Sequence, residues 1–343
     1  MSATVKLYGA AAGIFFFAVS LSVSGHHSNS EYDRSVVTEF EGEVLSVSWR
    51  NPHILLAVAT TDENGLEVVW NLEGAAVSAQ RRHGVMGGLI EVGDQVRVAG
   101  AASTRRPRYM LVDHLLLPSS VELLVGSTRE PRWLDTAVGS SVWTVDPAKV
   151  AAAQGQGIFR VWSRDVGPWY FRAADQYRVT ESAVAAAAEW DEFEDNPLLD
   201  CLAPGMPALM GNPYPMEFVE TDGAIELRFE EFDAVRLIHL SGVVNEADVS
   251  ASPLGYSVGR WEGDTLLVST SRINWPYFNR VGISQSAAVE VHERFRVVEN
   301  GNRLDYEMTV TDPQTLEEPF VWQGRWIWQP GEEVNLYDCT LPE

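Results

Sequence analysis

The sequence predicts an all-β protein with little helix: a small OB-like five-stranded barrel followed by a lipocalin-like antiparallel β-barrel. Three observations predict this class. Residues 40–125 order their elements as three strands, a short helix and two strands. Residues 216–329 alternate apolar and polar side chains in about eight segments. The 343-residue chain is 45% apolar, which suits one long domain or two ordinary ones.

The first expected domain spans residues 26–126. An Asn64-Gly65 turn predicts a hairpin, and Gly84 ends a short helix. The domain is acidic overall and lacks paired basic and aromatic stripes, so oligonucleotide binding on this barrel is not expected. The expected elements are strands at Phe40–Trp49, Ile54–Thr60, Leu66–Leu72, Gln95–Ala101 and Tyr109–Leu117, a helix within 74–83, and an edge strand at Val121–Val125.

The remaining chain is expected to form a linker and a second barrel. Residues 127–200 are interpreted as an irregular linker with a strand at Ile158–Trp162 and one helix over about Glu181–Phe193, capped by Thr180. Residues 201–343 carry the long alternating strands. Closing them into an up-and-down barrel removes exposed edges and leaves room for side chains or one small ligand.

Charge and missing motifs exclude several classes of function. The chain has 48 acidic and 25 basic residues, a net charge of −23, so it is not expected to bind nucleic acid or anionic lipid. It also lacks a phosphate-binding glycine loop, a dinucleotide fingerprint, a haem attachment motif and a zinc-protease motif. We therefore expect no nucleotide, flavin or haem cofactor.

The first 25 residues have the layout of a signal peptide. A basic start at Lys6 precedes an apolar run at 7–23, with small residues at Ser22, Ser24 and Gly25. An uncleaved anchor is the weaker alternative, because the apolar middle is short for a spanning helix. The mature protein is therefore expected in the periplasm or secreted, with no stable membrane insertion.

Cys201 and Cys339 are the only cysteines. Export places them in an oxidising compartment, where two thiols pair more often than they stay free. We expect a disulfide that ties the end of the chain to its middle.

Several segments resemble an exported bacterial family of unknown function. They are the HHS…EYD start, the NPH after the first strand, and the CLAPGMPALMGNPYPMEF, EEFDAVRLIHL, GYSVGRWEGDTL, INWPYFN and VEVHERF segments. The resemblance covers nearly the whole mature chain, and it implies export, two β-domains and the disulfide. It implies no activity. Many relatives carry a His-rich stretch where this chain has residues 282–286.

Glu293 is the first candidate for chemistry. It is in phase with the apolar Val291 and Phe295, so its carboxylate is expected inside the barrel. Such a group needs a partner, and Arg236 and Arg260 are the two candidates. The group is interpreted either as a structural ion pair or as a ligand anchor or general acid.

Further candidates lie on the turns around the barrel. Asp233 and His239 could pair as a catalytic dyad, or belong to a turn with ordinary salt bridges. Trp275 and Tyr277 sit on an aromatic loop that is either the lip of a pocket or a plug. The other side chains expected to line a ligand cavity are Tyr256 and Tyr306.

A metal site is the remaining candidate. Cleavage would leave His26 or Gly25 at the amino terminus, and the amine, backbone amides and imidazoles of His26 and His27 suit Cu(II). His53 could add a ligand if the tether folds back. A solvent-exposed tether is the alternative.

Three hypotheses for function follow. The first is an exported protein that binds a small apolar molecule in the C-terminal barrel, oriented by Glu293 with Arg236 or Arg260. The second is a cofactor-independent hydratase, isomerase or cyclase using the same cavity, with Glu293, His239 and Asp233 moving protons. The third is a periplasmic copper-binding protein.

Overall fold

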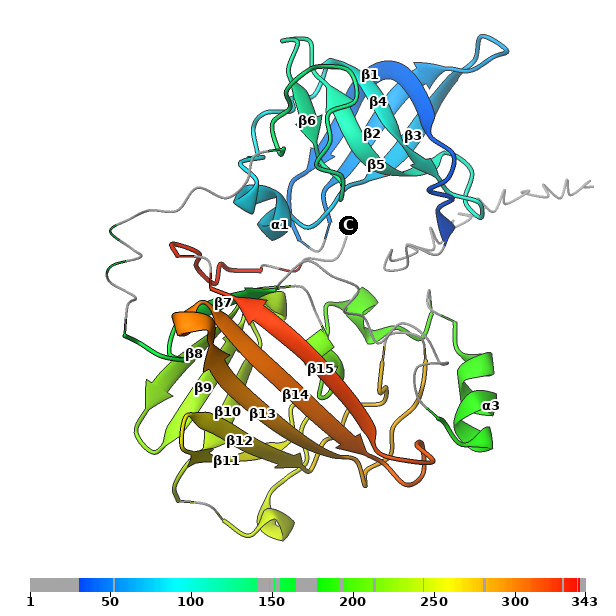
Figure 1. Ribbon diagram of the computed structural model, residues 1–343. Helices are drawn as coiled ribbons and strands as arrows, with labels where there is room; N and C mark the ends of the chain where they lie inside the picture. The colour runs from blue at the N-terminus through cyan, green and yellow to red at the C-terminus, as the bar shows by residue number, and fades with distance from the viewer. Residues whose placement is uncertain are drawn as a thin grey trace, which may run out of the picture.

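The computed structural model contains two β-barrels connected along the chain (Figure 1). Helix is scarce in the described part, where the longest helix, α3, covers Glu181–Glu189. The structure describes residues 31–51, 53–140, 148, 151, 155–164, 178–191, 194–211, 214–242, 244–279, 282–328, 330–337 and 339.

The first barrel has the OB-type topology that the sequence predicts. Its sheet order is β3-β2-β1-β4-β5-β6, and a parallel pairing of β3 with β5 closes five of these strands into a ring. Helix α1 follows β3, as expected. The strands are β1 (Thr38–Ser48), β2 (Leu55–Thr61), β3 (Glu67–Glu73), β4 (Gln95–Ala102), β5 (Tyr109–Leu116) and β6 (Glu122–Leu124), and α1 covers Val77–Arg82.

Alternation of side chains explains why these segments pack as a barrel. Buried and more exposed residues alternate over the first half of β2 and of β4, as Leu56 and Val58 illustrate on β2 and Val96 and Val98 on β4. Burying one face of each strand removes apolar surface from water, at about 25 cal/mol per Å². The first domain therefore has its own hydrophobic core.

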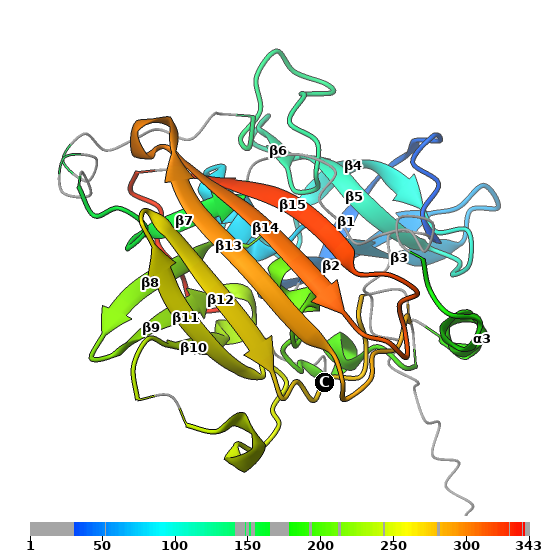
Figure 2. The same cartoon turned by 60° about the horizontal axis from the view of Figure 1, so that its bottom comes forward.

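The second barrel is closed, in the order β10-β11-β12-β13-β14-β15-β7-β8-β9. Figure 2 shows β12, β13, β14 and β15 side by side as a broad sheet. Its strands are β7 (Val161–Arg164), β8 (Met216–Thr221), β9 (Ala224–Phe229), β10 (Val235–His239), β11 (Tyr256–Glu262), β12 (Thr265–Ser271), β13 (Glu290–Val298), β14 (Arg303–Thr311) and β15 (Phe320–Ile327).

Two features of this barrel differ from a simple eight-stranded meander. Strand β7 comes from the segment interpreted as linker and pairs with both β15 and β8, so the barrel begins before residue 201. Strands β10 and β11 run parallel, joining Ile238 to Ser257 and His239 to Val258. The long connection at 240–255 permits this, because parallel neighbours need a crossover rather than a tight turn.

Helix α3 begins where the sequence predicts, at the residue after Thr180, whose hydroxyl accepts a hydrogen bond from the Ala183 N–H at 3.3 Å. It ends at Glu189, earlier than expected, because the backbone turns extended at Trp190. The acidic residues that follow therefore lie outside the helix.

The predicted disulfide is present. Cys201 and Cys339 are bonded, with their Cα atoms 5.8 Å apart and a sequence separation of 138 residues. The bond fixes the end of the chain to the segment between α3 and β8. In the part of the chain that the structure describes, no helix has the length and apolar character needed to cross a bilayer.

Candidate functional site

Glu293 points into the second barrel, as its phase on β13 predicts, and is 2% exposed. Its partner is Arg236 of β10, which is 1% exposed. Arg236 Nη1 donates to Glu293 Oε1 at 3.0 Å, and Arg236 Nη2 donates to Glu293 Oε2. The two residues form a bidentate buried ion pair across the barrel interior.

The remaining donors of Arg236 are also engaged. Its Nε donates to Ser257 Oγ at 2.9 Å, and its Nη2 donates to Thr270 Oγ1 at 2.6 Å. The second Nη1 donor faces the sulfur of Met210 at 4.0 Å. A thioether is a weak acceptor, so this is the least favourable of the contacts around the guanidinium.

Tyr306 on β14 completes the group. Its hydroxyl donates to Glu293 Oε1 at 2.8 Å. Burial, together with the neighbouring Glu293 carboxylate, raises the pKa of Tyr306 well above its usual value, so the phenol stays protonated. Its ring packs at 4.8 Å from Phe295 and 5.1 Å from Trp326.

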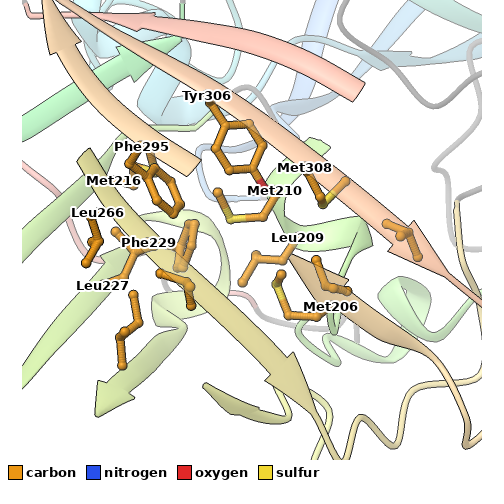
Figure 3. Close-up of a cluster of buried hydrophobic side chains, with 14 of the residues drawn as sticks. Met206, Leu209, Met210, Met216, Leu227, Phe229, Leu266, Phe295, Tyr306 and Met308 are labelled. Carbon is orange, nitrogen blue, oxygen red and sulfur yellow. The ribbon is translucent and has the colours of Figure 1, made fainter. Parts of the chain in front are cut away.

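A short turn closes the barrel beside this group. Residues Ala208–Gly211 form one turn of 3-10 helix, and Met206, Leu209 and Met210 are buried against the strands. Figure 3 shows Met210 beside the Tyr306 side chain, with Leu209 and Met206 farther along. We call Met206–Gly211 the methionine plug.

The aromatic loop packs against this plug. The Gln285 side chain donates to the carbonyl oxygens of Met206 at 2.9 Å and of Trp275 at 2.8 Å. A Cβ on Gly205 would lie 2.5 Å from the Trp275 side chain, so this close approach requires glycine. Phe278 is fully buried, and the loop thus acts as part of the closure.

The outer side of the plug is a shallow aromatic hollow. Trp275 and Tyr277 line it together with Trp190, and Ala208 of the plug forms part of its floor. Burial and the nearby Asp195 carboxylate raise the pKa of Tyr277. Trp275 and Tyr277 therefore form the edge of this hollow, and Trp275 also packs against the chain at Gly205.

Arg260 and Tyr256 do not line the interior, contrary to the sequence analysis. Arg260 is exposed and pairs with Glu262 at 2.8 Å. Tyr256 is buried outside the barrel wall, where its hydroxyl accepts from the Val244 N–H at 3.1 Å. The inward positions of β11 are Ser257 and Gly259, and a Cβ on Gly259 would lie 2.7 Å from Ile238 Cγ2. Because these inward residues are small and their outward neighbours are large, the sequence pattern indicated the wrong face of β11 as the inner one.

Of the two alternatives for Asp233 and His239, the catalytic dyad is not formed. Asp233 lies in the turn before β10 and His239 is the last residue of that strand, which advances about 3.3 Å per residue. Asp233 Oδ1 accepts from the Tyr337 N–H at 2.9 Å, while His239 packs on the ring of Tyr256 at 5.0 Å.

The acidic cluster at the start of β10 instead holds the end of the chain. Glu230, fully buried, accepts from the Asn335 N–H at 3.1 Å, next to the contact between Asp233 and Tyr337. Asn51 of the first domain donates to the Tyr337 carbonyl at 2.9 Å. These carboxylates are therefore hydrogen-bond acceptors for the segment that the disulfide also tethers.

His26 and His27 lie outside the described residues, so the copper site stays a prediction. His53 is described: its Nδ1 lies 3.1 Å from Glu73 Oε1 and 3.1 Å from the Gly74 carbonyl. Burial raises the pKa of Glu73, and His53 and Tyr32 lower it by less, so the net shift is upward. Among the described residues, no group of three His, Cys, Asp or Glu side chains is arranged to hold a metal.

Three contributors to the buried group escaped the sequence analysis: Ser257, Thr270 and Met210. The alternation of β12 offered a signal for Thr270, because it is in phase with Leu266 and Val268. Met210 lies in a turn and not in a strand, so no alternation of side chains in the sequence could assign it to the site.

Comparisons with known proteins are consistent with the resemblance at the start of the chain. Residues 15–108 match the model of a family of unknown function (DUF6152), which spans the His-His-Ser start and most of the first barrel. No curated protein and no solved structure matches the chain.

Proposed function

We propose that this is an exported binding protein whose second barrel holds a small, largely apolar ligand at Arg236, Glu293 and Tyr306. The observation that carries the proposal is the contact of Arg236 Nη1 with Met210 Sδ at 4.0 Å. A ligand oxygen in place of that sulfur would accept a much stronger hydrogen bond from the cation.

The polar group is costly for a purely structural role. A buried ion pair is rarely more stabilising than apolar residues of the same volume, so its presence argues for a further use. The pair is electrically neutral, and Glu293 already accepts from Arg236 and Tyr306. The ligand is therefore a neutral molecule with a carbonyl or hydroxyl oxygen, because a carboxylate would bury an unpaired charge.

The methionine plug supplies the means of entry. Methionine is unbranched and adapts its shape, so the plug can yield to a ligand at lower cost than a strand. Its outer side borders the hollow of Trp190, Trp275 and Tyr277. An apolar molecule that enters from this side would displace Met210 from its contact with Arg236.

The enzyme alternative has less support. Asp233 and His239 are far apart, and both oxygens of Glu293 accept hydrogen bonds from Arg236 or Tyr306. A general acid or base must be able to exchange its proton with a substrate, and this carboxylate would first have to leave its partners.

The test compares a medium-chain methyl ketone with the alkane of the same length. The ketone is expected to raise the thermal midpoint of the full-length protein, and Met210→Ala, which opens space beside Arg236, is expected to enlarge that shift. Met110→Ala, a buried methionine of the first barrel, is the matched control and leaves the shift unchanged. Equal effects of ketone and alkane, or no response of the Met210→Ala protein, would refute the proposal.

A further inference from the structure

The outer face of the second barrel carries a groove rich in arginine. It lies over β13, β14 and β15, on the side opposite the buried ion pair, and has a volume of about 550 Å³. These strands form the broad sheet visible in Figure 2. The lining residues are Thr265, Arg294, Arg296, Arg303, Asp305, Tyr306, Glu307, Gln323, Gly324 and Arg325.

The groove concentrates arginine in a chain that is acidic overall. Four arginines line it against two carboxylates, Asp305 and Glu307, whereas the whole protein carries −23. At the rim, Asp264 pairs with Arg296 at 3.2 Å and Glu299 pairs with Arg303. With these two rim carboxylates included, arginines and carboxylates are equal in number, so the groove is close to neutral within a strongly acidic protein.

Arg294 is the residue that distinguishes the groove from an ordinary surface ion network. Its cross-strand neighbour is Glu307, but Glu307 accepts instead from the Gln323 side chain at 2.8 Å. Among the residues that the structure describes, the side chain of Arg294 makes no hydrogen bond or ion pair. Its guanidinium thus keeps its donors available at the groove wall, in a chain with nearly twice as many acids as bases.

The strand register places two more arginines, Arg296 and Arg325, on the same outer face of the sheet. Arg296 and Arg325 flank Asp305 on the two neighbouring strands. Adjacent strands are about 4.8 Å apart, so their Cα atoms are separated by roughly 10 Å. With Arg294 one outward position away on β13, the three arginines occupy a triangle of outward positions, a spacing suited to a molecule with two or three anionic groups.

We propose that this groove binds a small ligand that carries two or more carboxylate or phosphate groups. Arg294 is the principal donor, and Arg296 and Arg325 bind the remaining anionic groups. The planar guanidinium binds both carboxylate and phosphate oxygens through two parallel hydrogen bonds. A long polyanion does not fit, because the rest of the surface would repel it. Only Tyr306 belongs both to the groove lining and to the interior site, and none of the three arginines does, so this proposal stands or falls independently of the one above.

The experiment is a calorimetric titration of the full-length protein with citrate and with inorganic pyrophosphate at low ionic strength. Binding of at least one probe is expected, with the affinity falling as salt rises. The stronger probe shows whether carboxylate or phosphate is preferred. Arg294→Gln is expected to weaken that binding at least tenfold. Arg228→Gln, an exposed arginine on β9 that pairs with Glu226, is the matched control and leaves binding unchanged.

A gain-of-affinity variant guards against effects on folding. Glu307→Gln removes the carboxylate beside Arg294 and is expected to tighten binding severalfold, which an unfolded protein cannot do. Absence of binding by both probes would overturn the proposal. So would equal losses in the Arg294→Gln and Arg228→Gln proteins, or tighter binding of heparin than of either small probe.

Discussion

The ion pair between Arg236 and Glu293 gives the sharpest test of the fold. Both side chains are almost fully buried, and Arg236 donates two parallel hydrogen bonds to the Glu293 carboxylate. Replacing either one with methionine leaves an uncompensated charge in an apolar interior, which costs about 3–5 kcal/mol. Replacing both with methionine removes the charges together and is expected to cost less than either single change.

The assay is a double-mutant cycle by urea denaturation, followed through tryptophan fluorescence because Trp162 and Trp326 are buried in the same barrel. The coupling energy is expected to be at least about 3 kcal/mol. The exposed pair Arg260 and Glu262 on β11 is the control, with an expected coupling energy below about 1 kcal/mol. A coupling energy for the buried pair no larger than that of the control would refute the reasoning.

Three further predictions concern the rest of the molecule. Burial raises the pKa of Glu122, but the N–H groups of residues 132–134 and His114 lower it by more, so the net shift is downward. The stability that ionised Glu122 gives the folded protein is therefore complete above the ordinary pKa of 4.5 and is lost as the pH falls through the folded-state pKa. Glu122→Gln should flatten the loss of stability at acid pH in pH-dependent denaturation and lower the free energy of unfolding by about 2 kcal/mol at neutral pH. Reducing the bond between Cys201 and Cys339 should lower the free energy of unfolding by about 4–5 kcal/mol, and an unchanged melting curve with reductant would contradict this. Calorimetry of the processed protein with Cu(II) should show tighter binding than in the His27→Ala protein, and equal affinities would remove the copper hypothesis.

Strand periodicity predicted much of the fold and one half of the site. Val291, Glu293 and Phe295 alternate with charged residues on β13, so the alternation alone was enough to assign the side chain of Glu293 to the interior. On β11 the same reasoning failed, because the inward residues Ser257 and Gly259 are small and their outward neighbours are large.

What the sequence by itself determined is local: where strands and turns occur, which face of each long strand is apolar, and that the two cysteines would pair. Only the tertiary structure decided the rest. It selected Arg236 over Arg260, brought the Met210 sulfur from a turn onto a guanidinium, and assigned the acids before β10 to the end of the chain. Periodicity fixes the direction of a side chain relative to its own strand, but partners across a closed barrel depend on the register and closure of all its strands together.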